Sequence, residues 1–283
     1  MKFERTKVFN FENAFFGMRA PLESWSKSDS WFGIDSLFDP HEYDLDILEN
    51  WKEKDYPNGF SSTQDEDAYA AKKLEWLNNN GVLSPLEYSD TTEFIDVAYL
   101  GPNDLDLAQR LIKAGSEHRK FLRQIFVSVY MTAPLELLKE MDTYKVGVTC
   151  NSTSTMHKIQ SKPITLDCFE LKDYPTIEEA KLLSDRDQWF TESEILNFME
   201  PTIDKCEDLR QAYIKTKDKR YWKMLIQLLP ESWLQSRMYT LNYEVIRSIV
   251  RQRKNHRLVE WKAFIDWAHT LPYAEELIFY AND

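Results

Sequence analysis

The sequence predicts an α+β fold, because many helical patterns and few strand patterns follow one another without regular alternation. A half-buried strand is expected at residues 125–132, where apolar side chains occupy every second position, and another at 94–100. Apolar residues at helical spacing predict helices at about 65–79, 104–115, 202–216, 218–229, 240–252 and 257–271, with one more within 182–199. The expected architecture is a small mixed or antiparallel sheet packed with several helices.

Turn and cap residues set the ends of these elements. Asp65 and Asp104 are expected to cap the first two helices, and Gly81 and Gly115 to end them. Pro134 follows the strand at 125–132 and can begin a helix, because the first helical position needs no backbone donor.

Length and charge limit the function classes. The 283 residues suffice for one large domain, expected over 1–283 with an N-terminal extension or insertion at about 35–100 and an acidic insertion at about 160–200. A net charge of -12 argues against a broad nucleic-acid surface but leaves room for a small anion held by a few arginines.

Several familiar sites are not expected. Neither Gly-rich phosphate-loop pattern occurs, and the histidines lack the spacing of metal ligands. The three cysteines show no C-x-x-C spacing, which suggests reduced thiols in a cytosolic protein. No apolar signal core and no run approaching 18 apolar residues is present, so we expect a cytoplasmic protein without a membrane partner.

The helix at 240–252 carries an unusual buried stripe. Asn242, Ile246, Ile249 and Arg253 fall on one helical line. An arginine on an apolar face needs an anion, which could be a structural acidic partner or a bound phosphate, unless its stem reaches water. A second line carries only basic side chains and is predicted to face solvent: Arg247, Arg251 and Lys254.

Two polar groups lie between residues 134 and 159. Glu140, Tyr144 and Lys145 stand at the end of an apolar helix and form either a ligand rim or ordinary surface. Asn151, Ser152 and Ser154 belong to a row of five small polar side chains, which can hold phosphate or carbonyl oxygens or simply form a helix cap or loop.

The order of these parts resembles the flavin-dependent thymidylate synthases (ThyX-like proteins). Residues 118–124 resemble the family motif H-x-x-P-F-E-H, with His118 as its first histidine and Gln124 at the second. The strand ending in Ala133-Pro134 matches the family's strand ending in Ala-Pro. Residues 143–145, Thr-Tyr-Lys, stand where the family has Arg-His-Arg.

The resemblance continues beyond this degenerate signature. Glu140 stands at a nucleotide-contacting glutamine, and Asn151 matches the motif's asparagine if one residue is inserted before it. Arg237, with a one-residue shift, and Arg253 resemble two arginines of the nucleotide-phosphate site. The wording of the chain is also similar to a group of phage-borne proteins, which suggests a phage-type branch of this fold.

The resemblance implies a homotetrameric pyrimidine-nucleotide enzyme that uses FAD, with NADPH and methylene-tetrahydrofolate as further co-substrates. It would transfer a methyl or hydroxymethyl group to C5 of dUMP or dCMP in the cytoplasm (the host cytoplasm for a phage-encoded chain). The implied nucleotide-binding residues are Arg237, Arg253, Glu140, Asn151, Ser152 and Ser154. The implied flavin-binding residues are His118, Gln124, Tyr144 and Lys145, and no residue is assigned as catalytic.

Two substitutions relative to the family alter the expected chemistry. Thr143 and Tyr144 lack the positive charge of the family's arginine and histidine, and Lys145 keeps one charge without the planar fork of arginine. Glu140 can only accept hydrogen bonds when ionised, so it favours a base that presents a donor, such as cytosine. The alternative function is a non-catalytic nucleotide-binding or protein-interaction protein on the same scaffold.

Overall fold

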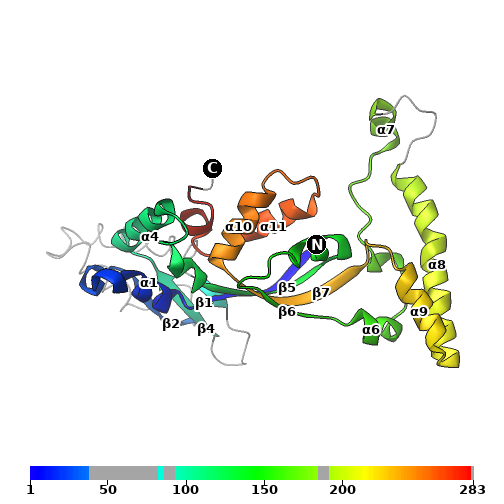
Figure 1. The fold of residues 1–283 in the computed structure, drawn as a ribbon, viewed down its shortest axis with the longest axis horizontal. Coiled ribbons are helices and arrows are strands. Elements are labelled where there is room, and N and C mark those ends of the chain that lie inside the picture. Colours follow the sequence, from blue (N-terminus) through cyan, green and yellow to red (C-terminus); the bar gives the residue numbers. More distant parts are fainter. Residues whose placement is uncertain (38–81, 86–92, 184–190, 282–283) are drawn as a thin grey trace. The chain divides into compact units, whose positions relative to one another are not determined.

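A computed structural model of the chain describes residues 1–37, 82–85, 93–183 and 191–281. The helix expected at 65–79 and its stop at Gly81 lie outside these residues. Figure 1 shows a mixture of helices and sheet strands, so the predicted α+β class is confirmed.

The strands form two sheets. The first has the order β1-β5-β7-β6, formed by β1 (Lys2–Phe9), β5 (Phe126–Pro134), β7 (Leu234–Asn242) and β6 (Thr149–Ser152). In the second, β4 (Glu93–Tyr99) pairs antiparallel with both β2 (Trp31–Leu37) and β3 (Val82–Pro85). Both predicted strands are therefore present, at β5 and β4.

The described helices surround these sheets in chain order. They are α1 (Phe11–Arg19), α4 (Pro102–Ala114), α5 (Leu135–Met141), α6 (Thr155–Lys158), α7 (Ile177–Leu183), α8 (Glu192–Thr216), α9 (Lys219–Leu228), α10 (Tyr243–Arg253) and α11 (Glu260–His269). Short 3-10 turns join several of them, at Lys120–Arg123, Ile159–Ser161 and Leu166–Cys168 among others.

The chain folds into two compact units. The first comprises Met1–Glu4, Val129–Tyr239 and Arg257–Ala263. The second comprises Arg5–Ser128, Thr240–His256 and Phe264–Asp283. The boundaries fall within or beside strands and helices rather than in linkers, and each unit is described below by itself.

The first unit is built around α8 and α9, which lie side by side in Figure 1. Apolar residues of both helices and of the 159–169 segment form one cluster: Ile159, Ile164, Phe169, Met199, Ile203, Cys206, Leu209 and Leu225. Residues 182–199 and 202–216 were expected in separate helices, but α8 runs from Glu192 to Thr216 with Pro201 inside it. The buried face of α8 on both sides of the proline holds the helix together.

The second unit is organised by aromatic packing. Phe11 contacts the rings of Tyr243 and Tyr273, with centroids 5.6 and 5.9 Å apart, and Phe15 contacts Phe121 at 5.6 Å. Every one of these rings is buried. Residues from α1, α10 and the C-terminal segment therefore share one core.

Two cap and surface predictions were wrong. Asp104 does not cap α4, because the helix already begins at Pro102 with Gly101 as its N-cap; the buried Asp104 carboxylate instead pairs with Arg19 at 2.5 Å. Arg247 does not face solvent, because its guanidinium donates to the carbonyls of Ile278, Tyr280 and Ala281 at 2.6 to 3.0 Å. In both cases a distant segment supplies the partner that makes burial of the charge tolerable.

Candidate functional site

Glu140 and Tyr144 meet at one tryptophan of the first unit. Glu140 lies in the last turn of α5, and its Oε2 accepts a hydrogen bond of 2.8 Å from the indole nitrogen of Trp261. The Tyr144 ring stands edge-on to the same indole, with ring centroids 6.3 Å apart. Trp261 is fully buried at the start of α11, so it fixes the end of α5 from beneath.

Arg237 on β7 reaches the same segment. Its Nη1 donates to Oδ1 of Asp142 at 2.6 Å and to the Tyr239 hydroxyl at 3.3 Å, while Nε donates to Gln235 at 3.0 Å. Asp142 is only two residues from Glu140, so the tertiary fold brings together positions almost a hundred residues apart in sequence.

The local environment of this arginine is partly dry. Burial raises the pKa of Tyr239 to about 12, although the neighbouring Arg237 charge acts in the opposite direction. The Arg237 side chain keeps 12% of its surface exposed, whereas its partner Asp142 is half exposed. A phosphate could therefore approach the arginine only by sharing it with Asp142 or displacing that carboxylate.

The polar row at 151–155 divides into two roles. Asn151 and Ser152 are exposed on β6. Ser154 caps the short helix α6, because its Oγ accepts a hydrogen bond of 3.0 Å from the His157 backbone. Ser154 also lines a cavity of about 1050 Å³ in the first unit, which is the largest change that the structure makes to the predicted site.

Three expected site residues belong to the second unit. His118 and Gln124 flank the 3-10 turn Lys120–Arg123 and are exposed. Arg253 ends α10 and is half-buried. Lys145, in the first unit, is exposed. The predicted nucleotide and flavin sets are thus divided between the two units, and only Glu140, Tyr144 and Arg237 are brought close together within one of them.

The four side chains predicted to hold a flavin have chemistry that fits it. His118 and Gln124 are exposed and offer an imidazole and a carboxamide for ring carbonyls and nitrogens. Tyr144 offers a ring face or edge, and the exposed Lys145 offers one ammonium to a phosphate. When bound, FAD would supply the electron transfer that these side chains cannot perform.

The sequence missed most of the cavity. Its lining includes Lys158 and Lys162 after the Ser/Thr row, Thr132 from β5 and Ser236 from β7. Two lysines four residues apart, directly after five small polar residues, were the available signal. Strand residues such as Thr132 carry no such signal, because only the sheet places them beside the row.

Neither metal nor membrane contact is indicated by the described residues. Among residues 1–37, 82–85, 93–183 and 191–281, no group of three or more His, Cys, Asp or Glu side chains is arranged to hold a metal ion. None of the helices within these ranges is long and apolar enough to cross a membrane.

Comparisons with known proteins gave similarity at the level of structure. No protein-family model and no curated protein matches the sequence. Among solved structures, the flavin-dependent thymidylate synthase ThyX of Helicobacter pylori complexed with FAD and dUMP is similar at a TM-score of 0.44 and 16% identity, over 64% of this chain and 84% of that one. Another structure of that enzyme with FAD and dUMP gives a TM-score of 0.43 and 15% identity, over 88% of this chain and 97% of that one.

Proposed function

We propose that this protein is a flavin-dependent enzyme that transfers a methyl or hydroxymethyl group to C5 of a pyrimidine nucleotide of the dUMP or dCMP type, with a methylene-folate donor. The observation that carries the proposal is the meeting of Arg237 with the Glu140–Tyr144 segment in the first unit. The family resemblance assigns the phosphate to this arginine and the base to Glu140. Those two assignments require spatial proximity, and the fold provides it.

The residue types suit the two ends of such a nucleotide. The guanidinium of Arg237 can form paired hydrogen bonds with a phosphate, and its partial burial would strengthen them. The Glu140 carboxylate accepts one bond from Trp261 and keeps lone pairs for a base donor such as the cytosine amino group. We therefore expect dCMP to bind more tightly than dUMP.

Arg237→Gln tests the phosphate assignment. Loss of the charged contact should weaken dCMP binding by about tenfold or more in calorimetric titration. Arg220→Gln is the matched control, because Arg220 also pairs with an aspartate, Asp218, at 2.5 Å but lies on α9. Equal affinity of wild type and Arg237→Gln would refute the assignment, whatever the catalytic activity.

Catalysis is tested separately from binding. The protein reconstituted with FAD should absorb as a bound oxidised flavin, and with NADPH and methylene-tetrahydrofolate it should release tritium from C5-labelled dCMP or dUMP. Glu140→Gln should shift the preference from dCMP toward dUMP, because a carboxamide can donate as well as accept. A preference that the substitution leaves unchanged would remove Glu140 from the base-binding role.

A second candidate is a nucleotide-binding protein without catalysis. It is favoured by the Arg237–Asp142 pair, because a carboxylate at 2.6 Å opposes the approach of a phosphate. The replacement of Arg-His-Arg by residues 143–145 also removes charge that would hold a flavin. A protein that binds dCMP through Arg237 but neither retains flavin nor releases tritium would establish this alternative.

A further inference from the structure

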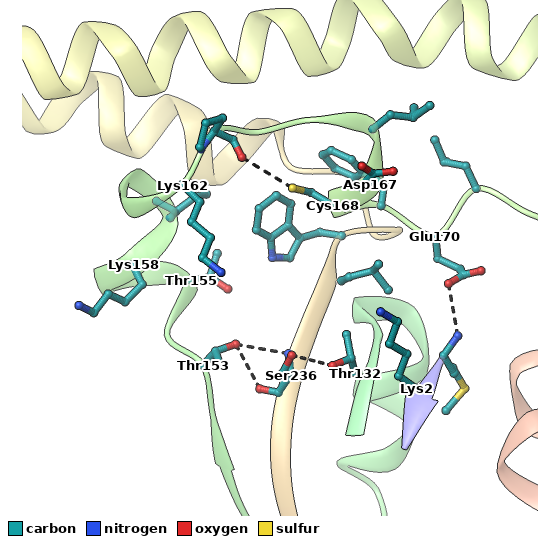
Figure 2. A pocket seen from close by; sticks show the side chains of 18 of the residues that line it. Lys2, Thr132, Thr153, Thr155, Lys158, Lys162, Asp167, Cys168, Glu170 and Ser236 are labelled. Atoms are coloured by element: carbon teal, nitrogen blue, oxygen red, sulfur yellow. Dashed lines mark hydrogen bonds and ion pairs between the residues drawn. The ribbon is translucent and has the colours of Figure 1, made fainter. Parts of the chain in front are cut away.

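A second possible binding site is the cavity of about 1050 Å³ in the first unit (Figure 2). Neither Arg237, Glu140 nor Tyr144 lines it. Its walls come from the 153–172 segment, β1, β5 and β7, and its volume is sufficient for a small organic ligand. The side chains in it show which chemistry it would accept.

Hydroxyl groups on one wall retain hydrogens to donate. Thr132 and Ser236 share one hydrogen bond of 2.7 Å, in which only one of the two hydroxyls can be the donor. Thr155 Oγ1 accepts from Gln235 at 3.2 Å, and Ser154 Oγ accepts from the His157 backbone. Within the described part of the chain no acceptor is present for the hydrogens of Thr155 and Ser154, so this wall offers donors to a ligand rich in acceptor oxygens.

Two ammonium groups stand beside these hydroxyls. Lys158 and Lys162 are exposed, and neither forms an ion pair with any residue that the structure describes. Figure 2 shows both lysines and Thr155 on one side of the pocket. Two unneutralised positive charges next to free hydroxyl donors are suited to one phosphate dianion.

The opposite side of the pocket has different chemistry. Asp167 and Glu170 lie there in Figure 2, and Glu170 Oε1 is 3.4 Å from the ammonium of Lys172. Carboxylates there can accept hydrogen bonds from sugar hydroxyls or amino groups. Phe169 and Trp233, whose rings meet edge-on with centroids 5.4 Å apart, supply apolar lining for a flat ring.

We infer that this cavity binds a phosphate monoester of the nucleoside monophosphate class, as a site separate from the one built on Arg237. The phosphate contacts Lys158, Lys162 and the Ser154–Thr155 hydroxyls. The sugar hydroxyls face Asp167 and Glu170, and the base packs against the aromatic lining. The inference does not depend on the proposed transferase activity, because none of its residues takes part in that chemistry.

The test is calorimetric titration of the full chain with UMP, uridine and inorganic phosphate at low salt. The background is Arg237→Gln, which disables the proposed dCMP site and leaves the cavity intact. UMP should bind more tightly than either uridine or phosphate alone. Lys158→Gln combined with Lys162→Gln should weaken UMP binding by about tenfold or more and leave uridine binding unchanged.

A matched control is Lys215→Gln combined with Lys223→Gln, two exposed lysines on α8 and α9 outside the cavity. These changes remove the same total charge and should leave UMP affinity within about twofold of its parent. The inference is overturned if uridine binds as tightly as UMP, or if both lysine pairs have the same effect. It is also overturned if UMP binding is absent in the Arg237→Gln background, because binding elsewhere cannot then be assigned to the cavity.

Discussion

The Glu207–Arg210 pair on α8 gives a stability prediction that can be worked out from the structure. Oε2 of Glu207 accepts hydrogen bonds from Arg210 at 2.7 Å and from the Ile164 backbone at 2.9 Å, and Oε1 accepts from Arg210 and Gln211. Arg210 in turn donates to the carbonyl of Gln160 at 2.8 Å. The pair thus fastens the segment that lines the cavity to the long helix.

The carboxylate gains stability from these donors. Hydrogen bonding from Arg210 is the main reason why the pKa of Glu207 falls from 4.5 to about 2. A lowering of this size corresponds to at most about 3.4 kcal/mol. Because 27% of the Glu207 side chain is exposed, we expect about 1–2 kcal/mol after solvent screening.

The pH dependence has a definite sign. Since the folded-state pKa is depressed, the contribution is complete above the unfolded value of 4.5 and is lost as pH falls toward about 2. Glu207→Gln should therefore lower the free energy of unfolding by about 1–2 kcal/mol at pH 7 and by progressively less between pH 4.5 and 2.

Urea unfolding of wild type and Glu207→Gln at pH 7, 4 and 3 measures this difference. Glu200→Gln is the control, because Glu200 is exposed on the same helix and has no printed partner among the residues that the structure describes. A loss of stability that is the same at pH 7 and pH 3 would refute the electrostatic reasoning. So would equal effects of the two substitutions at pH 7.

Three further outcomes are expected. Arg247→Ala should lower the free energy of unfolding by about 3 kcal/mol, because three carbonyls lose a charged donor, while Arg251→Ala at an exposed position should change it by less than about 0.5 kcal/mol in the same thermal unfolding assay. Asp142→Asn should raise dCMP affinity by about fivefold in calorimetry by freeing its arginine partner, and a fall in affinity would contradict the phosphate assignment. Cys150, which is exposed, should react with a thiol reagent in the native protein, whereas Cys206, whose pKa is raised by burial, should react only after unfolding.

Sequence periodicity was sufficient for the regular elements. The alternation in residues 125–132 predicted β5, with Val127, Val129 and Met131 buried, and the apolar face of residues 240–252 predicted α10. Local pattern determines such elements because burial repeats with the period of the backbone. The end of α10 shows the limit: Asn242 is not part of the buried stripe but caps the helix, with its Oδ1 accepting from the Val245 backbone at 3.0 Å.

Charged residues were the least predictable, because their environment depends on distant partners. Arg247 shares a line with Arg251, and sequence gave no reason to separate them. One is buried against C-terminal carbonyls and the other is exposed. Helical spacing places a side chain on a face, but only tertiary contacts decide whether that face is covered.

For this protein, the sequence by itself determined the α+β class, the main strand and helix positions, and the resemblance that selected Glu140, Tyr144 and Arg237. Only the tertiary structure decided that these three meet around Trp261 and Asp142, and that Lys158, Lys162 and the hydroxyls of β5 and β7 enclose a separate cavity. The physical reason is range. Periodicity and caps act over a few residues, whereas a binding site is assembled by packing between segments that the chain order keeps apart.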